Sequence, residues 1–381
     1  MPLIEPLTKN VLRSFACTTA LALFACLFAA PARVEAQQPP KFKVDPAWPL
    51  ELPNNWILGQ VGGLTVDSHD HIWVLQRPGS DTVDELGAAQ TPPRSICCFA
   101  AKPVLEFDAS GKLLNAWGGP APAGAAYNWP KVEHGIHVDR NDNVWIGGND
   151  PADRMVLKFS RDGSFLMQIG KPSTDPMDSS RTDILGRPAG IEVDEDAHEV
   201  YIADGYGNRR VIVFDSETGA FKRMWGAYGN KPSDADPGPY APGAPPDQQF
   251  RTPVHCVHIA HDGLVYVCDR SNDRIQVFTK QGKFVKEFAV RPETLGIGSA
   301  WDIAFSPDKG QRYLFVADGE DNVIWTIQRS DGKILGSAGH NGRNAGQFHW
   351  IHQIASDSAG NLYTGEVDTG KRIQRFVIAK E

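Results

Sequence analysis

Three histidines recur at one position of a pattern that repeats along this chain. His134, His255 and His352 each stand two residues before the apolar residue that opens a short strand-like segment. A neutral imidazole nitrogen is a good zinc ligand, and three histidines with one open coordination position form a catalytic zinc site. An ion with an open position can polarise a substrate oxygen or lower its pKa. The three histidines therefore predict a metal site; the alternative is that they line a wet channel and bind water.

Other residues able to do chemistry follow the second strand-like segment in three of the repeated units. They are Arg77, Tyr206 and Arg270. A tyrosine beside a dication and cationic neighbours is expected to give up its proton more readily, and so to act as a base. An arginine can hold a substrate carboxylate through two parallel hydrogen bonds. The alternative is that these residues only belong to the turns of the repeat.

The repeated unit predicts the elements that must position these side chains. Each unit has a short apolar strand, an Asp/Asn/Gly turn, a strand rich in Val, Tyr or Trp, then a third strand, a Gly turn and a fourth strand. The openings of six units are found at residues 64–75, 136–147, 191–204, 257–269, 303–318 and 354–365. Four antiparallel strands in roughly 40 to 60 residues are typical of a propeller blade. The sequence predicts an all-β, six-bladed β-propeller that resembles NHL-repeat proteins; an open sandwich of many strands is the alternative.

A six-bladed ring would bring the three histidines to one axis. They occur in the second, fourth and sixth units, and blades are about 60° apart, so the side chains start from points about 120° apart. The long segments rich in Pro and Gly, such as Pro78–Pro103, fall on the same face of the ring, and long ordered loops often carry a site. His137 and His258 share the next position of the repeat. Strand alternation predicts that they turn away from the axis and serve as packing residues.

The ends of the chain complete the predicted organisation. Residues 56–381 form the propeller, whose sixth unit lacks an outer strand, and the segment 37–55 supplies it through Lys41–Trp48. Residues 1–36 resemble a signal peptide, with basic Lys9 and Arg13, an apolar run and a cleavage site before Gln37. The apolar run is too short for a membrane span. We therefore expect a protein exported to the periplasm or secreted.

The composition and the number of cysteines further limit the kind of protein and the partners that this sequence can have. The net charge of −8 and the lack of a basic stripe argue against nucleic-acid partners, and no feature identifies a partner protein. Cleavage would leave four cysteines, too few for a disulfide-built scaffold. Cys256 and Cys268 flank a tight turn and could face each other across a hairpin. The state of Cys97 and Cys98 stays open.

Several segments together resemble one enzyme family, peptidyl-α-hydroxyglycine α-amidating lyase. The resemblance covers the predicted propeller from about Gly59 to Phe376. It is carried by the segments Gly59–Gly63, Glu133–Ile136, Asp204–Asn208, Asp269–Gln276 and Phe348–His352. It implies a lyase that cleaves the C–N bond of a hydroxyglycine-type small molecule or peptide to an amide and glyoxylate. The alternatives are a non-catalytic NHL propeller that binds a protein or carbohydrate, and a propeller hydrolase of the lactonase type.

The resemblance also implies roles for single residues. His134, His255 and His352 match the zinc ligands, Tyr206 the base, and Arg77 and Arg270 the arginines of the site. A structural calcium would bind the backbone carbonyls of two residues and the side chain of a third: Val61, Ile136 and Gln353. The family has an aspartate at the place of Gln353, and an amide brings no charge to a calcium ion. Gly207 also replaces a half-cystine, so the disulfide pattern of the family is not kept.

Overall fold

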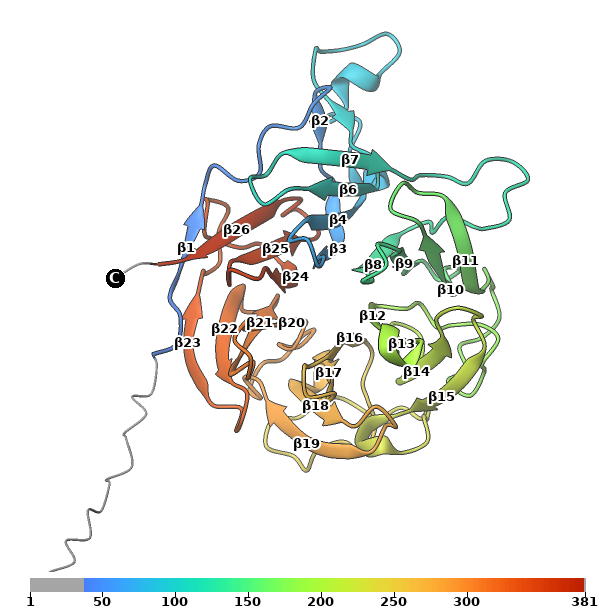
Figure 1. The fold of residues 1–381 in the computed structure, drawn as a ribbon, viewed down its shortest axis with the longest axis vertical. Helices are drawn as coiled ribbons and strands as arrows, with labels where there is room; N and C mark the ends of the chain where they lie inside the picture. Colours follow the sequence, from blue (N-terminus) through green and yellow to red (C-terminus); the bar gives the residue numbers. More distant parts are fainter. Residues whose placement is uncertain (1–37, 380–381) are drawn as a thin grey trace, which may run out of the picture. The chain divides into compact units, whose positions relative to one another are not determined.

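The repeated units fold as four-stranded antiparallel sheets arranged in a ring about a common centre (Figure 1). The structure is a computed structural model, and it describes residues 38–379. Residues 1–36, the predicted signal peptide, lie outside this range. Within it the protein is all-β, with six blades, as the sequence predicts.

The blades follow one another along the chain, and the first strand of each lies nearest the channel (Figure 1). Blade one contains β3 (Gln60–Val66), β4 (Ile72–Arg77), β6 (Val104–Phe107) and β7 (Leu113–Trp117), and blade two contains β8 (Glu133–Val138), β9 (Val144–Gly148), β10 (Met155–Phe159) and β11 (Phe165–Gly170). Blade three contains β12 (Gly190–Asp194), β13 (Glu199–Asp204), β14 (Arg210–Asp215) and β15 (Phe221–Trp225), and blade four contains β16 (Val254–Ile259), β17 (Val265–Asp269), β18 (Arg274–Phe278) and β19 (Phe284–Ala289).

The last two blades bring the N-terminal segment into the ring. Blade five contains β20 (Asp302–Phe305), β21 (Tyr313–Asp318), β22 (Val323–Gln328) and β23 (Ile334–Ala338). Blade six contains β24 (Ile351–Ser356), β25 (Leu362–Glu366), β26 (Ile373–Ile378) and, as its outer strand, β1 (Phe42–Asp45). Phe42 pairs with Ile378 and Asp45 with Arg375, so strands from the two ends of the chain share one sheet. This pairing protects the outer edge of β26.

Short elements complete the loops. A parallel pair, β2 (Trp56–Ile57) and β5 (Phe99–Ala100), lies outside the blades. The 3-10 helices are η1 (Pro78–Ser80), η2 (Gly87–Ala89), η3 (Glu195–Ala197), η4 (Ala227–Gly229) and η5 (Arg270–Asn272). No helix in residues 38–379 is long and apolar enough to cross a membrane.

The turns after the first strands explain why Asp recurs in the repeat. Asp67 and Asp139 each accept backbone hydrogen bonds from their own turn and a bond from the indole of the next strand, Trp73 or Trp145. One carboxylate therefore closes the turn and orients a large core side chain. The apolar side chains form six clusters, each between two neighbouring blades. The core is thus a ring of blade-to-blade contacts.

Residues 38–379 contain two disulfides. Cys256 and Cys268 are paired across β16 and β17 and are bonded, as their places in the sequence suggested. The neighbours Cys97 and Cys98, in the long loop of blade one, are bonded to each other.

Candidate metal centre

A local irregularity of the innermost strands aims the three histidines at the channel. β8, β16 and β24 each shift register by one residue at the histidine, between His134 and Ile136, Val254 and Cys256, and Ile351 and Gln353. Such a β-bulge bends the strand and redirects a side chain. In blade two it uses Gly135, whose φ of 74° lies in the left-handed region that glycine adopts without strain.

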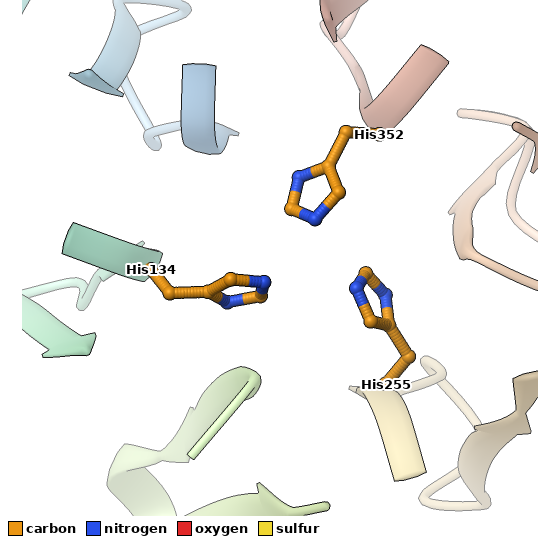
Figure 2. Close-up of side chains that lie close together, drawn as sticks. All are labelled: His134, His255 and His352. Atoms are coloured by element: carbon orange, nitrogen blue, oxygen red, sulfur yellow. The ribbon is translucent and has the colours of Figure 1, made fainter. Parts of the chain in front are cut away.

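The bulges bring the three rings together (Figure 2). Figure 2 shows His134, His255 and His352 entering from three sides and pointing toward one another. Their ligand atoms all lie within 4.8 Å of one another, and the ring centroids are 4.8 to 5.4 Å apart. All three side chains are buried. The predicted trigonal arrangement of imidazoles is therefore present at the channel.

Backbone carbonyls of the following blades orient two of the rings. His134 Nδ1 lies 3.1 Å from the Ala189 carbonyl oxygen, and His255 Nδ1 lies 2.6 Å from that of Trp301. A carbonyl only accepts, so Nδ1 carries the proton and Nε2 presents its lone pair to the centre. A second hydrogen bond of this kind is typical of metal-binding histidines.

The rings are neutral for electrostatic reasons. Burial lowers the pKa of all three histidines well below the ordinary value, and the neighbouring charges of Arg77 and Arg270 act in the same direction. Neutral imidazole is the form that binds metal. His352 Nδ1 is buried and has no hydrogen-bond partner in the described part of the chain, so no carbonyl orients this ring as in His134 and His255. Three neutral, converging imidazoles fit a zinc ion, whose bonds to nitrogen are about 2.1 Å long.

Tyr206 lies directly beside the histidines. It follows β13, and its Oη is 3.1 Å from Nε2 of both His134 and His255. Arg270 Nη1 lies 3.4 Å from the same oxygen, and its guanidinium carbon is 5.7 Å from the centre of the Tyr206 ring. The guanidinium of Arg187 is 5.6 Å from that centre. The phenol thus contacts two proposed metal ligands and lies close to two cations.

Arg77 and Arg270 belong to the same site. Both line a small cavity of about 160 Å³ together with Tyr206 and His352. Arg77 donates from Nε to the Glu133 carbonyl and from Nη1 to Gln60 Oε1, each at 2.8 Å. Arg270 donates from Nε to the Ile297 carbonyl at 3.0 Å and packs 4.4 Å above the Trp301 ring. Burial lowers the pKa of both arginines, so an anion entering this cavity would be stabilised.

A glycine makes room for Arg77. Gly62 occupies in blade one the position that histidines occupy in blades two, four and six. A Cβ at Gly62 would lie 2.3 Å from the Glu133 carbonyl oxygen and 3.1 Å from Arg77 Nε. Blade one therefore contributes an arginine to the site where other blades contribute an imidazole.

Sequence reasoning missed several residues of this cavity. Asn149 and Asp368 line it, and they stand just after the second strands of blades two and six. Arg77, Tyr206 and Arg270 were found at that same place in other blades, so extending the rule to every blade would have found both. Arg187, close to the Tyr206 ring, ends the long loop between β11 and β12, and the sequence pointed to that loop but not to this residue.

Two of the three residues predicted to bind calcium follow the histidines closely in the chain: Ile136 comes two residues after His134, and Gln353 directly after His352. Val61, Ile136 and Gln353 are buried in β3, β8 and β24. Ile136 and Gln353 line a second cavity of about 450 Å³, which Asp67 and Asp357, in the turns that follow β3 and β24, also line. A calcium site at these residues stays a prediction.

The expectation that His137 and His258 pack away from the channel is wrong. Both line the same 450 Å³ cavity. The β-bulge adds one residue to the alternation, so residues three apart, such as His255 and His258, both reach the channel. His258 Nε2 lies 2.9 Å from Asp302 Oδ1, and His258 Nδ1 lies 3.3 Å from Glu192 Oε2. His137 Nδ1 is 3.5 Å from the same Glu192 oxygen.

Comparisons with known proteins identify relatives that match most of this chain. Peptidyl-glycine alpha-amidating monooxygenase B of Xenopus laevis is 27% identical over 323 residues, which are 82% of this chain and 33% of that protein. The probable peptidyl-alpha-hydroxyglycine alpha-amidating lyase of Caenorhabditis elegans is 24% identical over 273 residues, 70% of this chain and 69% of that protein. The chain is a homologue of these lyases. It spans about a third of the length of the monooxygenases that it matches.

NHL repeat-containing protein 3 of Mus musculus is a further relative of this lyase homologue, 26% identical over 78% of this chain and 70% of that protein. Among solved structures, a streptogramin B lyase superposes with a TM-score of 0.50 at 14% identity, over 89% of this chain and 98% of that chain. A protein of unknown function from Bacteroides thetaiotaomicron superposes with a TM-score of 0.51 at 14% identity, over 84% and 70% of the two chains. These structures show the fold alone. No family model matches the chain.

Proposed function

We propose that this protein is an exported, zinc-dependent carbon–nitrogen lyase that converts an α-hydroxyglycine-type substrate to an amide and glyoxylate. The observation that carries the proposal is the position of Tyr206 Oη, 3.1 Å from Nε2 of both His134 and His255. Once deprotonated, a phenol oxygen that touches two of the three imidazoles can accept the proton of a substrate hydroxyl that reacts there. The lyase relatives support the same reaction class.

The chain's residues would divide the reaction between them. Arg77 and Arg270 bind the substrate carboxylate and place its hydroxyl near Tyr206. His134, His255 and His352 hold zinc, which when bound supplies a Lewis acid that makes the hydroxyl more acidic. Tyr206 takes the hydroxyl proton while the carbon–oxygen bond becomes a carbonyl and the C–N bond breaks. The electron pair of that bond stays on nitrogen, which takes up a proton to complete the amide.

The charge of the site favours this class of substrate. The guanidiniums of half-buried Arg77 and buried Arg270 line a cavity of about 160 Å³, a space suited to a glycolate-sized group. Placing a carboxylate between them offsets the desolvation that lowers their pKa values. A neutral substrate would not offset the desolvation of the two guanidiniums, so we expect the amide and ester analogues of the carboxylate to react poorly.

Metal analysis and turnover test the proposal together. We expect purified protein to hold about one zinc per chain, and a chelator to abolish cleavage of a hydroxyglycine-capped peptide until zinc is restored. Glyoxylate is the product to measure. Activity that survives complete removal of metal would exclude this mechanism.

The relationship to an NHL repeat-containing protein favours one second candidate, a non-catalytic binding propeller. Purified protein without stoichiometric metal, and without turnover after zinc is added, would favour that function. Export is tested separately, because a mature chain beginning at Gln37 in the periplasm or medium is the expected result.

A further inference from the structure

One acidic side chain, that of Asp368, lies among the residues that line the small cavity of the candidate metal centre. Asp368 is half-buried and comes two residues after the end of β25 in blade six. Within residues 38–379 its carboxylate has no hydrogen bond and no ion pair with another residue. Both of its oxygens can therefore accept hydrogen bonds from a molecule in the cavity.

The turn that contains Asp368 does not use this carboxylate. Its φ of 49° lies in the left-handed region, which aspartate adopts more readily than most residues. In other turns of the propeller the aspartate is held by its own backbone. Asp67, Asp139 and Asp318 each accept a hydrogen bond from the N–H group two residues further along. The backbone at Asp368 suits an aspartate, and its side chain is left available to a ligand.

The order of the blades places Asp368 across the cavity from the proposed base. The blades follow one another around the ring at about 60°, so blades three apart face each other (Figure 1). Arg77 of blade one is opposite Arg270 of blade four, and Tyr206 of blade three is opposite Asp368 of blade six. The cavity thus has a cation at each end of one diameter, and the phenol and the carboxylate at the ends of another.

We propose that Asp368 binds the N–H group of the scissile bond and holds the substrate nitrogen across the cavity from Tyr206. The inference rests on the proposed function, because that reaction places the substrate carboxylate at the two arginines and its hydroxyl at Tyr206. The reacting carbon then carries two hydrogen-bond donors, the hydroxyl and the N–H. An ionised carboxylate only accepts, and the hydroxyl faces Tyr206, so the N–H is the donor left for Asp368. The substrate class is a secondary amide of α-hydroxyglycine.

The charge of Asp368 makes this contact selective. Burial lowers the pKa of Arg77, and the negative charge of Asp368 opposes this shift, so the carboxylate acts within the cavity although no ion pair joins the two residues. The substrate is itself an anion, and an unpaired Asp368 would repel it. A bound N–H offsets this repulsion, whereas a substrate whose nitrogen carries no hydrogen leaves it in place. Asp368 therefore disfavours such substrates.

Methylation of the substrate nitrogen tests the proposal. For the wild type, kcat/KM for N-acetyl-α-hydroxyglycine should exceed that for its N-methyl derivative by at least about tenfold, as expected for a hydrogen bond to a charged group. In Asp368→Leu, which keeps the bulk of the side chain and removes its acceptors, the two values should lie within about threefold. Asp368→Asn suits the left-handed backbone and keeps one neutral acceptor, so its ratio should lie between these two.

The control and the contrary result are equally defined. Asp84→Ala changes an exposed acid in the long loop of blade one and should keep the wild-type ratio. Bound zinc should be equal in all of these proteins. The same ratio in Asp368→Leu as in the wild type would overturn the proposal, because steric exclusion of the methyl group would then explain the preference.

Binding separates this proposal from the reaction itself. N-acetylglycine and N-acetyl-N-methylglycine lack the hydroxyl, and their affinities can be measured by calorimetry on the purified protein. About tenfold tighter binding of N-acetylglycine by the wild type and by Asp84→Ala, with near-equal affinities in Asp368→Leu, supports the contact even if no substrate is cleaved. Equal affinities in the wild type, the same preference in all three proteins, or no binding of either compound overturns it whether or not the lyase reaction is found.

Discussion

The channel contains two groups of histidines, and they differ sharply although they lie on the same strands. His255 and His258 are three residues apart on β16, and both reach the channel. Burial lowers the pKa of His255 well below its ordinary value, with Arg270 acting in the same direction. Burial also opposes charge on His258, but the hydrogen bonds to Asp302 and Glu192 outweigh it and raise its pKa to about 10.

This comparison shows that residues on neighbouring blades determine whether a histidine of the channel is neutral or protonated. The upper group, His134, His255 and His352, meets arginines and carbonyls, so the rings stay neutral with lone pairs available for a metal. The lower group, His137 and His258, meets carboxylates. His258 joins Glu192 of blade three to Asp302 of blade five, and Asp302 accepts the Ile354 N–H of blade six at 3.0 Å. The first group suits chemistry and the second joins blades.

Removing one imidazole from the upper group should have the largest effect on metal content and turnover. His255→Ala should reduce bound zinc to well below one per chain and lower turnover by at least about a thousandfold, since the metal site would lose a ligand and its orientation. Metal content by mass spectrometry and glyoxylate release measure the two effects. His261→Ala, which changes an exposed histidine in the turn between β16 and β17, is the control that should change neither. Full activity in His255→Ala would remove the distinction between the groups.

Removing the hydroxyl of the proposed base, Tyr206, should have the next largest effect on turnover. Tyr206→Phe should lower kcat by about 10² to 10⁴, because the hydroxyl proton loses its acceptor. Bound zinc should stay at the wild-type level, since the phenol is not counted among the ligands. A loss of zinc equal to that in His255→Ala would instead make Tyr206 part of the metal site.

A substitution in the lower group should affect stability and spare the chemistry. His258→Ala leaves the buried carboxylates of Glu192 and Asp302 without their shared partner, which should cost about 3 kcal/mol of unfolding free energy. Urea unfolding at pH 7 measures this cost. Zinc content should not change. If His258→Ala instead lost zinc with unchanged stability, the assignment of the two groups would be reversed.

The pH dependence of that cost sharpens the comparison. His258 binds its proton more tightly in the folded chain than in the unfolded chain, where its pKa is about 6.5. Its stabilisation should therefore be complete below about pH 6.5 and be lost as the pH rises through about 10. The difference in unfolding free energy between the wild type and His258→Gln should shrink over this range. A difference that grows with pH would contradict a protonated His258.

The smallest effect concerns a cation that only the structure revealed. Arg187→Ala removes a guanidinium 5.6 Å from the centre of the Tyr206 ring, and should lower kcat by roughly three- to tenfold with zinc unchanged. Arg209→Ala, which changes an arginine not among the residues of the site, serves as the control in the same assay.

Much of the architecture could be predicted from residues alone because the information is local and repeated. Alternating apolar residues and Asp/Gly turns predict each strand, and six copies of one unit predict the ring. The position of His134, His255 and His352 in alternate units followed from aligning those copies. The roles of these residues, and of Tyr206, Arg77 and Arg270, stay proposals that the geometry supports.

Only the tertiary structure decided which way the side chains point and which partners they meet. Strand alternation predicted that His137 and His258 turn away from the channel axis, but the β-bulges at the neighbouring histidines turn them into the channel. No local sequence pattern predicts these bulges. The pKa direction of each imidazole depends on charges from other blades, such as Arg270 beside His255 and Asp302 beside His258. Such contacts join residues tens of positions apart. A repeated sequence unit is enough to predict the strands and the number of blades. The charges around each histidine, and its access to the channel, depend on how the blades meet in the closed ring.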